Sequence, residues 1–258
     1  MMPDNRPLKP VLSERKQRRG IYLLPNLFTT GALFAGFYAI VQAMNGRFEL
    51  AAVAIFIAMV LDGLDGRVAR MTHTQSAFGA EYDSLSDMVS FGVAPALVAY
   101  VWALKGMGKL GWIAAFVYCV GAALRLARFN TQHDTADRRY FQGLPSPAAA
   151  ALIAGLVWVM NEYGITGAEV KWLAFAVTLF AGLTMVSNIP YYSGKEINLR
   201  RSVPFVVVFL IAMAFVLIAY KPPQVLFGIV ALYALSGYAT WVWKTLRRDR
   251  KRTKSLAP

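Results

Sequence analysis

Cysteine and histidine are almost absent from this sequence of 258 residues. The only cysteine, Cys119, cannot form a disulfide within the chain, so cysteine usage does not indicate an oxidising or a reducing compartment. The first twenty residues lack an apolar core, and we therefore expect no cleavable signal peptide. The sequence also shows no internal repeat.

Long polar stretches are scarce as well, and apolar runs take their place. Hydrophobic residues make up 57% of the chain, and the mean hydropathy is +0.45; soluble domains are usually about half apolar or less. Runs of about 18–22 apolar residues recur, which is the length that a membrane-spanning helix needs. The sequence therefore predicts an all-α fold, a polytopic membrane bundle of about eight transmembrane helices. The expected spans lie near residues 22–44, 48–66, 84–104, 110–127, 147–163, 170–189, 203–220 and 224–243.

Basic residues outnumber acidic ones, giving a net charge of +13, but they are unevenly placed. If the spans alternate in direction, 22 of the 27 Lys and Arg residues fall on the side that holds both termini. Lys and Arg gather on the cytoplasmic side of membranes, so we expect both termini in the cytoplasm and the protein in the cell (inner) membrane. The charge indicates attraction to anionic membrane lipids rather than to nucleic acid. We divide the chain into a basic tail or surface segment at 1–20, a membrane domain at 21–244 and a basic tail at 245–258.

Four of the eight aspartates lie between residues 62 and 87, within or beside predicted spans. Carboxylates at membrane depth are costly, rare and usually functional. At roughly 100° per residue, Asp62 and Asp65 share one helix face, and Asp83 and Asp87 share a face of the next helix. The polar stretch 72–76 can turn the chain so that the two faces meet, making an oxygen-rich site for Mg²⁺ or Mn²⁺ on the cytoplasmic side. Alternatively, the small residues nearby only pack helices, and paired acids at a helix end form a solvated cap.

The spacing of these aspartates resembles the motif of the CDP-alcohol phosphotransferases, integral-membrane enzymes of phospholipid synthesis. The motif reads D-x2-D-G-x2-A-R-x8-G-x3-D-x3-D. This sequence meets every position, with Asp62, Asp65, Gly66, Ala69, Arg70, Gly79, Asp83 and Asp87. The resemblance implies a helical membrane enzyme, commonly a homodimer, that uses a pair of divalent ions, Mg²⁺ or Mn²⁺.

The resemblance also implies roles for individual residues, which make the membrane domain the catalytic domain. One metal ion would lie on Asp62, Asp65 and Asp83, and a second among Asp62, Asp83 and Asp87, with Asp87 as the general base. A Pro-Asn-x-x-Thr entry to the first span would add Asn26 and Thr29 to the nucleotide site, although both could simply cap the helix. The expected CDP-lipid contacts are Asn26, Thr29, Gly66, Ala69, Arg70, Ser76 and Gly79.

Two later stretches resemble the phosphatidylserine synthase branch of that family. They are Arg125-Leu-Ala-Arg128-Phe-Asn130 and Gly143-Leu-Pro145-Ser146-Pro147. The branch implies transfer of the phosphatidyl group from CDP-diacylglycerol to L-serine, giving phosphatidylserine and CMP. Arg125 or Arg128 could hold the serine carboxylate, with Pro145 and Ser146 beside the alcohol. Alternatively, the arginines only anchor the helix at the membrane surface, and the prolines only form a rigid entry turn.

Other functions stay open at this point. The same chemistry could act on glycerol 3-phosphate, an inositol phosphate or choline. A divalent-cation transporter would also bind metal on carboxylates, but such sites tend to lie near the midplane, often within repeated halves. Phosphatidylserine synthesis is also performed by an unrelated type of enzyme that uses H-x-K chemistry, and neither His73 nor His133 is followed by x-Lys.

Overall fold

The computed structural model describes residues 23–131, 140–192 and 205–255. The predicted tail at 1–20 lies outside the described residues, as do the last three residues of the chain. Most of the described chain is helical, and the helices follow the predicted spans closely. Their bounds are α1 (Leu23–Met44), α2 (Phe48–Met71), α3 (Ala77–Asp87), α4 (Ala94–Ala99), α5 (Lys109–Thr131), α6 (Ser146–Glu162), α7 (Lys171–Val186), α8 (Phe205–Tyr220) and α9 (Pro222–Ser255).

The third predicted span is one continuous rod of 31 residues, Ala77–Met107, whose helical pitch changes along its length. It begins as α3 and passes through the π-helical segment η1 (Met88–Val93) into α4. A second π-helical segment, η2 (Tyr100–Leu104), and a short 3₁₀ turn, η3 (Lys105–Met107), complete it. The rod is longer than the predicted span because α3 already begins at Ala77, before the acidic residues Asp83 and Asp87.

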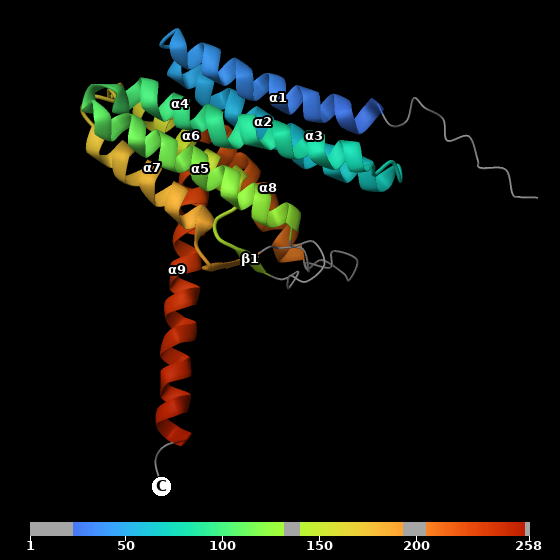
Figure 1. The fold of residues 1–258 in the computed structure, drawn as a ribbon, viewed down its shortest axis with the longest axis vertical. Helices are drawn as coiled ribbons and strands as arrows, with labels where there is room; N and C mark the ends of the chain where they lie inside the picture. Colours follow the sequence, from blue (N-terminus) through green and yellow to red (C-terminus); the bar gives the residue numbers. More distant parts are fainter. Residues whose placement is uncertain (1–22, 132–139, 193–204, 256–258) are drawn as a thin grey trace, which may run out of the picture.

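Small residues line the interfaces of the bundle. Figure 1 shows α1 beside α2, and α5 beside α7. Ala39 and Ala58 are completely buried in the core, together with many other alanines. Where α5 crosses α7, a Cβ atom added to Gly182 would lie 2.8 Å from the Cα atom of Tyr118. Such close backbone approach is how membrane helices gain packing contacts.

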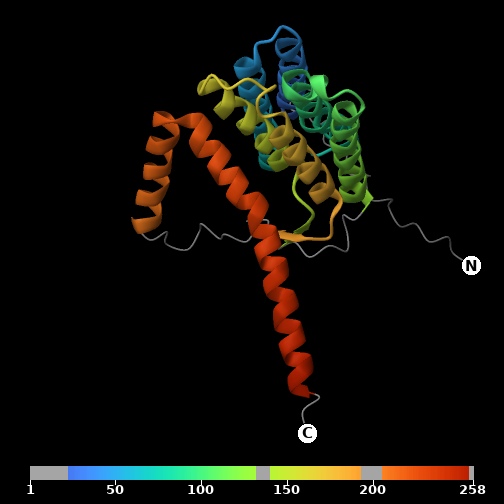
Figure 2. The same ribbon diagram turned by 90° about the vertical axis from the view of Figure 1, so that its left-hand side faces the viewer.

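Helix α8 lies apart from the bundle and beside α9 (Figure 2). Its large apolar side chains, such as Phe209 and Phe215, are exposed. Helices that are apolar all round belong in a core or in a membrane, so this surface suits lipid contact. Helix α9 continues beyond the predicted span to Ser255, through most of the predicted tail at 245–258 (Figure 1).

One short pair of strands accompanies the helices. Strand β1 (Tyr140–Gln142) pairs antiparallel with β2 (Pro190–Tyr192). Gly143 follows β1 with a left-handed φ of +78°, and a Cβ atom there would meet the carbonyl oxygen of Met185. The glycine is therefore needed to lead the chain from β1 into α6. Three-residue strands are too short to show an alternating pattern, which explains why the sequence predicted helices alone.

The apolar lengths support a membrane protein. Among the described residues, four helical stretches are long and apolar enough to cross a bilayer: Leu24–Met44, Ala77–Met107, Lys109–Thr131 and Pro222–Trp243. Helices α6, α7 and α8 are apolar but shorter, and α2 carries the charges of the aspartate motif in its last turns. The predicted fold class, a helical membrane protein, is confirmed.

Candidate active site

The turn between α2 and α3 reverses the chain just after the first two aspartates. Thr74, within this turn, donates its amide to the Ala69 carbonyl at 3.1 Å. His73 has a left-handed φ of 53°, so its backbone serves the turn. Ser76 caps α3, because its Oγ accepts from the N–H of Gly79 at 3.0 Å. The predicted polar turn is thus a structured connection between the two acidic helices.

Three carboxylates meet where these helices face one another. One oxygen from each of Asp62, Asp83 and Asp87 lies within 4.8 Å of the other two, and all three side chains are partly buried. The Asp62 carboxyl also lies within hydrogen-bonding reach of Asp87, and Asp65 is similarly close to Asp83. Carboxylates this close repel one another unless a cation or a proton lies between them. The all-oxygen donor set fits a hard divalent cation such as Mg²⁺ or Mn²⁺.

Thr29 of α1 contacts both acidic helices. Its hydroxyl is buried and donates to Asp65 Oδ2 at 2.8 Å, with the Pro25 carbonyl 3.2 Å from the same hydroxyl. Its backbone carbonyl accepts from Ser86 Oγ at 3.1 Å. The hydroxyl of Thr29 is thus engaged by an aspartate, and the nucleotide contact expected for Thr29 stays a prediction. Thr29 therefore orients Asp65 relative to α3.

The other predicted nucleotide contacts lie at the end of α2, at the start of α3 and, for Asn26, in the first turn of α1. A Cβ atom on Gly79 would lie 3.1 Å from Ser76 Oγ and 3.5 Å from Asn26 Oδ1, so these three residues are neighbours. A Cβ atom on Gly66 would lie 3.5 Å from Arg70 Nη1. Arg70 and Ser76 are exposed. The two glycines keep space open beside polar side chains, as a bulky anionic ligand requires.

Arg125 and Arg128, which the sequence left equivalent, have different partners. Arg125 is partly buried and donates from Nη1 to Ser146 Oγ at 2.8 Å. Its Nε is buried and has no hydrogen-bond partner among the described residues. Its guanidinium also interacts electrostatically with Asp87. Arg128 instead donates from Nη1 to Asn188 Oδ1 at 3.2 Å. The two arginines therefore lie in different surroundings.

Ser146 is completely buried at the start of α6, directly after Pro145. The Pro145 carbonyl accepts from the amide of Ala149 at 2.9 Å, which begins the helix. Proline is well suited to this place because its ring restricts the backbone at the helix entry. The predicted pair of Pro145 and Ser146 therefore presents a fixed hydroxyl to Arg125.

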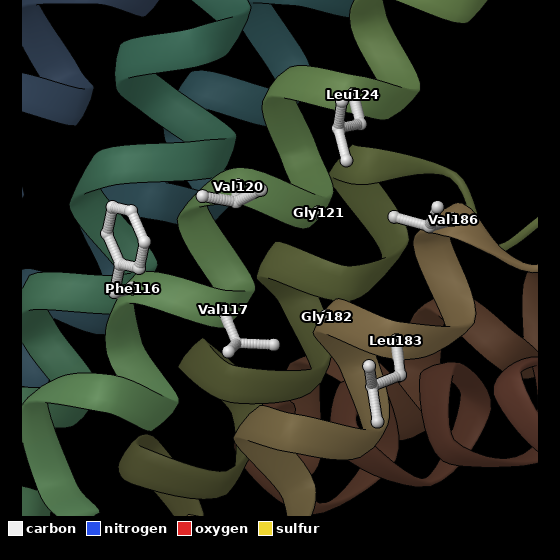
Figure 3. Close-up of a pocket in the computed structure, with 8 residues that line it drawn as sticks. All are labelled: Phe116, Val117, Val120, Gly121, Leu124, Gly182, Leu183 and Val186. Carbon is white, nitrogen blue, oxygen red and sulfur yellow. The ribbon is translucent and has the colours of Figure 1, made fainter.

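A groove of about 270 Å³ lies between α5 and α7 (Figure 3). Gly121 and Gly182 form its floor, and apolar side chains such as Val120 and Leu183 form its walls. Its lining carries no ionisable side chain. The groove therefore offers no group for acid–base or metal chemistry.

The sequence matches the CDP-alcohol phosphatidyltransferase family over residues 22–187. The chain belongs to this family. The matched stretch runs from α1 to the end of α7 and includes the acidic cluster, Arg125 and Ser146. Members of the family are metal-dependent, and the three-carboxylate cluster fits that requirement.

Similar proteins come from distant organisms. A protein of Helicobacter pylori is 35% identical over 235 residues, 91% of this chain and 98% of its own length. One from Mycobacterium bovis is 39% identical over 70% of this chain and 65% of its own length. One from Methanocaldococcus jannaschii is 34% identical over 73% of this chain and 82% of its own length. Each of these family members is named CDP-diacylglycerol–serine O-phosphatidyltransferase.

Sequence reasoning missed several supporting contacts in this family member. Nothing in the sequence singled out Asn188, yet it is the partner of Arg128. Asn130 exchanges hydrogen bonds with Ser84, at 3.0 and 3.3 Å, and so ties the end of α5 to α3. Asn130 ends the Arg-Leu-Ala-Arg-Phe-Asn stretch, so its position near the two arginines could have marked it as a candidate site residue. Asn188 lies just beyond the end of α7, and the residues around it in the sequence gave no such indication.

Proposed function

We propose that this protein transfers the phosphatidyl group of CDP-diacylglycerol to the hydroxyl of L-serine, forming phosphatidylserine and releasing CMP. The new bond joins the serine oxygen to the phosphorus that carries diacylglycerol. The bond that breaks joins this phosphorus to the oxygen that leaves with CMP. The observation that carries the proposal is the meeting of Asp62, Asp83 and Asp87 beside Arg125. Family membership and the names of the relatives support it.

Asp62, Asp83 and Asp87 would hold one divalent cation, Mg²⁺ or Mn²⁺, and Asp65 would complete a second site with Asp62 and Asp83. A bound pair of cations would neutralise the phosphate charge that otherwise repels the nucleophile and would stabilise the leaving group. The Thr29 hydroxyl donates to Oδ2 of Asp65 and so fixes the orientation of this carboxylate. This arrangement supports a metal role for Asp65 although it lies beside the cluster rather than within it.

Asp87 is proposed as the general base. It would take the proton from the serine hydroxyl as the oxygen approaches phosphorus. Asp87 is the member of the cluster whose charge acts on the Arg125 guanidinium, which supports placing the acceptor beside it. Asp62 and Asp83 would keep the role of metal ligands.

Arg125 is proposed to bind the serine carboxylate. Its buried Nε has no partner among the described residues, and leaving such a donor unsatisfied is costly. A carboxylate can accept from Nε and from a terminal nitrogen at once. Ser146 would hold the guanidinium in place, and Pro145 would shape the same wall. Glycerol 3-phosphate or an inositol phosphate would need a denser basic cluster here, to which Arg128 could still contribute although it donates to Asn188.

The nucleotide would lie at the cytoplasmic ends of α2 and α3. Asn26, Ser76 and Gly79 would contact one part of the CDP group, and Gly66 and Arg70 the other, with Ala69 between them on α2. This placement requires the active site to face the cytoplasm at the cell (inner) membrane, as the distribution of basic residues predicts. Membrane lipids would surround the bundle, and we expect the enzyme to be a homodimer with basic tails at 1–20 and 245–258.

The test is CMP release by detergent-purified protein given CDP-diacylglycerol, Mg²⁺ or Mn²⁺, and one alcohol at a time. We expect release with L-serine and its loss when a chelator removes the metal. Release with glycerol 3-phosphate, an inositol phosphate or choline instead would keep the reaction class and refute the acceptor. No release with any alcohol, together with metal uptake into liposomes containing the protein, would favour a cation transporter.

A further inference from the structure

The rod that carries Asp83 and Asp87 contains a proline, Pro95, in its interior. In an α-helix, the N–H of residue 95 would donate to the carbonyl of Phe91, four residues earlier. Proline has no N–H, and its ring clashes with that carbonyl. Phe91 is completely buried, so its carbonyl cannot turn to water. The rod therefore needs a different donor at this point.

The structure supplies that donor from α5. The hydroxyl of Tyr118, which is completely buried, donates to the carbonyl of Phe91 at 2.9 Å. The rod changes to π-helical pitch at the same place, in η1, which begins at the residue after Asp87. Ala94 donates its amide to the Val89 carbonyl, five residues back, as a π-helical turn requires. Tyr118 thus binds the π-helical turn η1 from the side of α5.

Helix α1 holds the opposite side of this turn. Ser90, within η1, is completely buried and donates from Oγ to the Ala32 carbonyl at 3.0 Å. Gly36 makes the approach possible, because a Cβ atom there would lie 2.7 Å from the Cα atom of Ser90. The π-helical turn is therefore fixed between α1 and α5 by one buried hydroxyl on each side.

A wider turn changes the direction of the side chains on either side of it. One added residue rotates the following helix by about 100° relative to the preceding one. Asp83 and Asp87 can then face Asp62 of α2, while Ala94 and Val98, which are completely buried, face the core. With an ordinary α-helical turn in place of η1, either the two aspartates or the two buried apolar residues would point in a different direction. The direction of the Asp87 carboxyl therefore depends on η1.

We propose that Tyr118 is a positioning residue for Asp87: its hydroxyl, together with that of Ser90, fixes the π-helical turn that aims the Asp87 carboxyl into the acidic cluster. The inference deepens the proposed function and rests on it, because it assumes that Asp87 binds metal and acts in the transfer. Tyr118 does not need to touch the substrate.

The test compares Tyr118→Phe with Tyr191→Phe, a closely matched control. Tyr191 is also completely buried, and its hydroxyl also donates to a helical carbonyl, that of Ala234, at 2.7 Å. For both variants, kcat and the KM values are measured by CMP release, and Mn²⁺ binding without substrates is measured by electron paramagnetic resonance. We expect Tyr118→Phe to lower kcat about ten- to a hundred-fold with little change in the KM for CDP-diacylglycerol, since small displacements of a reacting group have effects of this size.

Mn²⁺ binding should weaken in Tyr118→Phe, and Tyr191→Phe should keep the wild-type kcat and Mn²⁺ binding. A folded Tyr118→Phe protein with wild-type kcat and Mn²⁺ binding would overturn the inference, and so would an equal loss in both variants. If Tyr118→Phe does not fold, Ser90→Ala decides: lower kcat with weaker Mn²⁺ binding supports the role of the turn, and wild-type values overturn it.

Failure of the proposed function is a separate outcome. It would appear as no serine-dependent CMP release by the wild-type protein, or as normal release by Asp87→Asn. A wild-type enzyme that needs Asp87 but tolerates Tyr118→Phe would refute only the positioning role.

Discussion

Replacing Thr29 with valine tests whether α1 takes part in the metal centre. The variant keeps nearly the same side-chain shape and removes only the hydroxyl. In the structure, Thr29 is 3% exposed and its hydroxyl donates to Asp65 Oδ2 at 2.8 Å. Asp65 is itself only 5% exposed, so water has little access to replace the lost donor. The substitution therefore removes one hydrogen bond to a carboxylate, together with the longer 3.2 Å contact to the Pro25 carbonyl.

The size of the effect follows from that bond. A hydrogen bond to a charged group contributes about 1.5–3 kcal/mol. Each 1.4 kcal/mol corresponds to about a tenfold change in an equilibrium or rate constant. If the bond serves to orient Asp65 for metal binding, Thr29→Val should weaken Mn²⁺ binding and lower kcat/KM by about ten- to a hundred-fold.

Thr30→Val is the matched control, one position along the same helix. The Thr30 hydroxyl is exposed, donates to the Asn26 carbonyl at 2.7 Å and also lies 2.9 Å from the Tyr82 hydroxyl, so neither partner is a carboxylate. Mn²⁺ titration and CMP release are measured for both variants and for the wild-type protein. The reasoning is refuted if Thr29→Val binds Mn²⁺ as tightly as the wild type, or if Thr30→Val loses as much affinity.

Three further substitutions test other parts of the structure. Asp87→Asn should leave CDP-diacylglycerol binding intact and lower kcat by about 100- to 10,000-fold, the usual contribution of a general base; a near wild-type rate would contradict that role. Arg125→Ala should raise the KM for serine by about tenfold or more, because a charge-assisted bond is lost, and leave the KM for CDP-diacylglycerol unchanged. An unchanged KM for serine would exclude Arg125 as the carboxylate partner. Gly182→Ala should destabilise the protein by about 1–3 kcal/mol, because the new methyl group would lie 2.8 Å from the backbone of α5. Thermal unfolding in detergent measures this loss, and Gly228→Ala, with no atom within 4 Å of the new methyl group, should show none.

Much of the helical arrangement was predictable because local composition determines it. A segment of about 20 apolar residues has few alternatives to a membrane-spanning helix, since the bilayer offers no partners for free backbone groups. That the two acidic helix faces meet was also predictable, because Asp83 and Asp87 are four residues apart on one helix and the polar turn at 72–76 is short. Both inferences use spacing along the chain and need no knowledge of tertiary packing.

The contacts that orient these groups were not predictable from spacing. The bond from Thr29 to Asp65 joins residues 36 positions apart, and the bond from Tyr118 to Phe91 joins residues 27 positions apart. Both depend on which helix faces are adjacent in the bundle. Pro95 was a visible signal that the third span could not be a regular helix, but the sequence did not identify the residue that would bond to the freed carbonyl. The different partners of Arg125 and Arg128 likewise arise from the packing of α5 against α6 and α7.

These long-range contacts give α1 a larger part in the site than nucleotide binding alone. The acidic ligands come from two helices, α2 and α3, and a metal site requires their oxygen atoms to keep a fixed separation. Thr29 contacts both helices: its hydroxyl donates to Asp65 of α2, and its carbonyl accepts from Ser86 of α3. Because both bonds come from one residue, a shift of α1 would move the two sets of ligands relative to each other. Helix α1 also presents Asn26 beside Gly79, one turn before Thr29, where the CDP group is proposed to bind. A ligand that contacts Asn26 would therefore also restrain the separation of the metal ligands, so nucleotide binding and metal binding should strengthen each other.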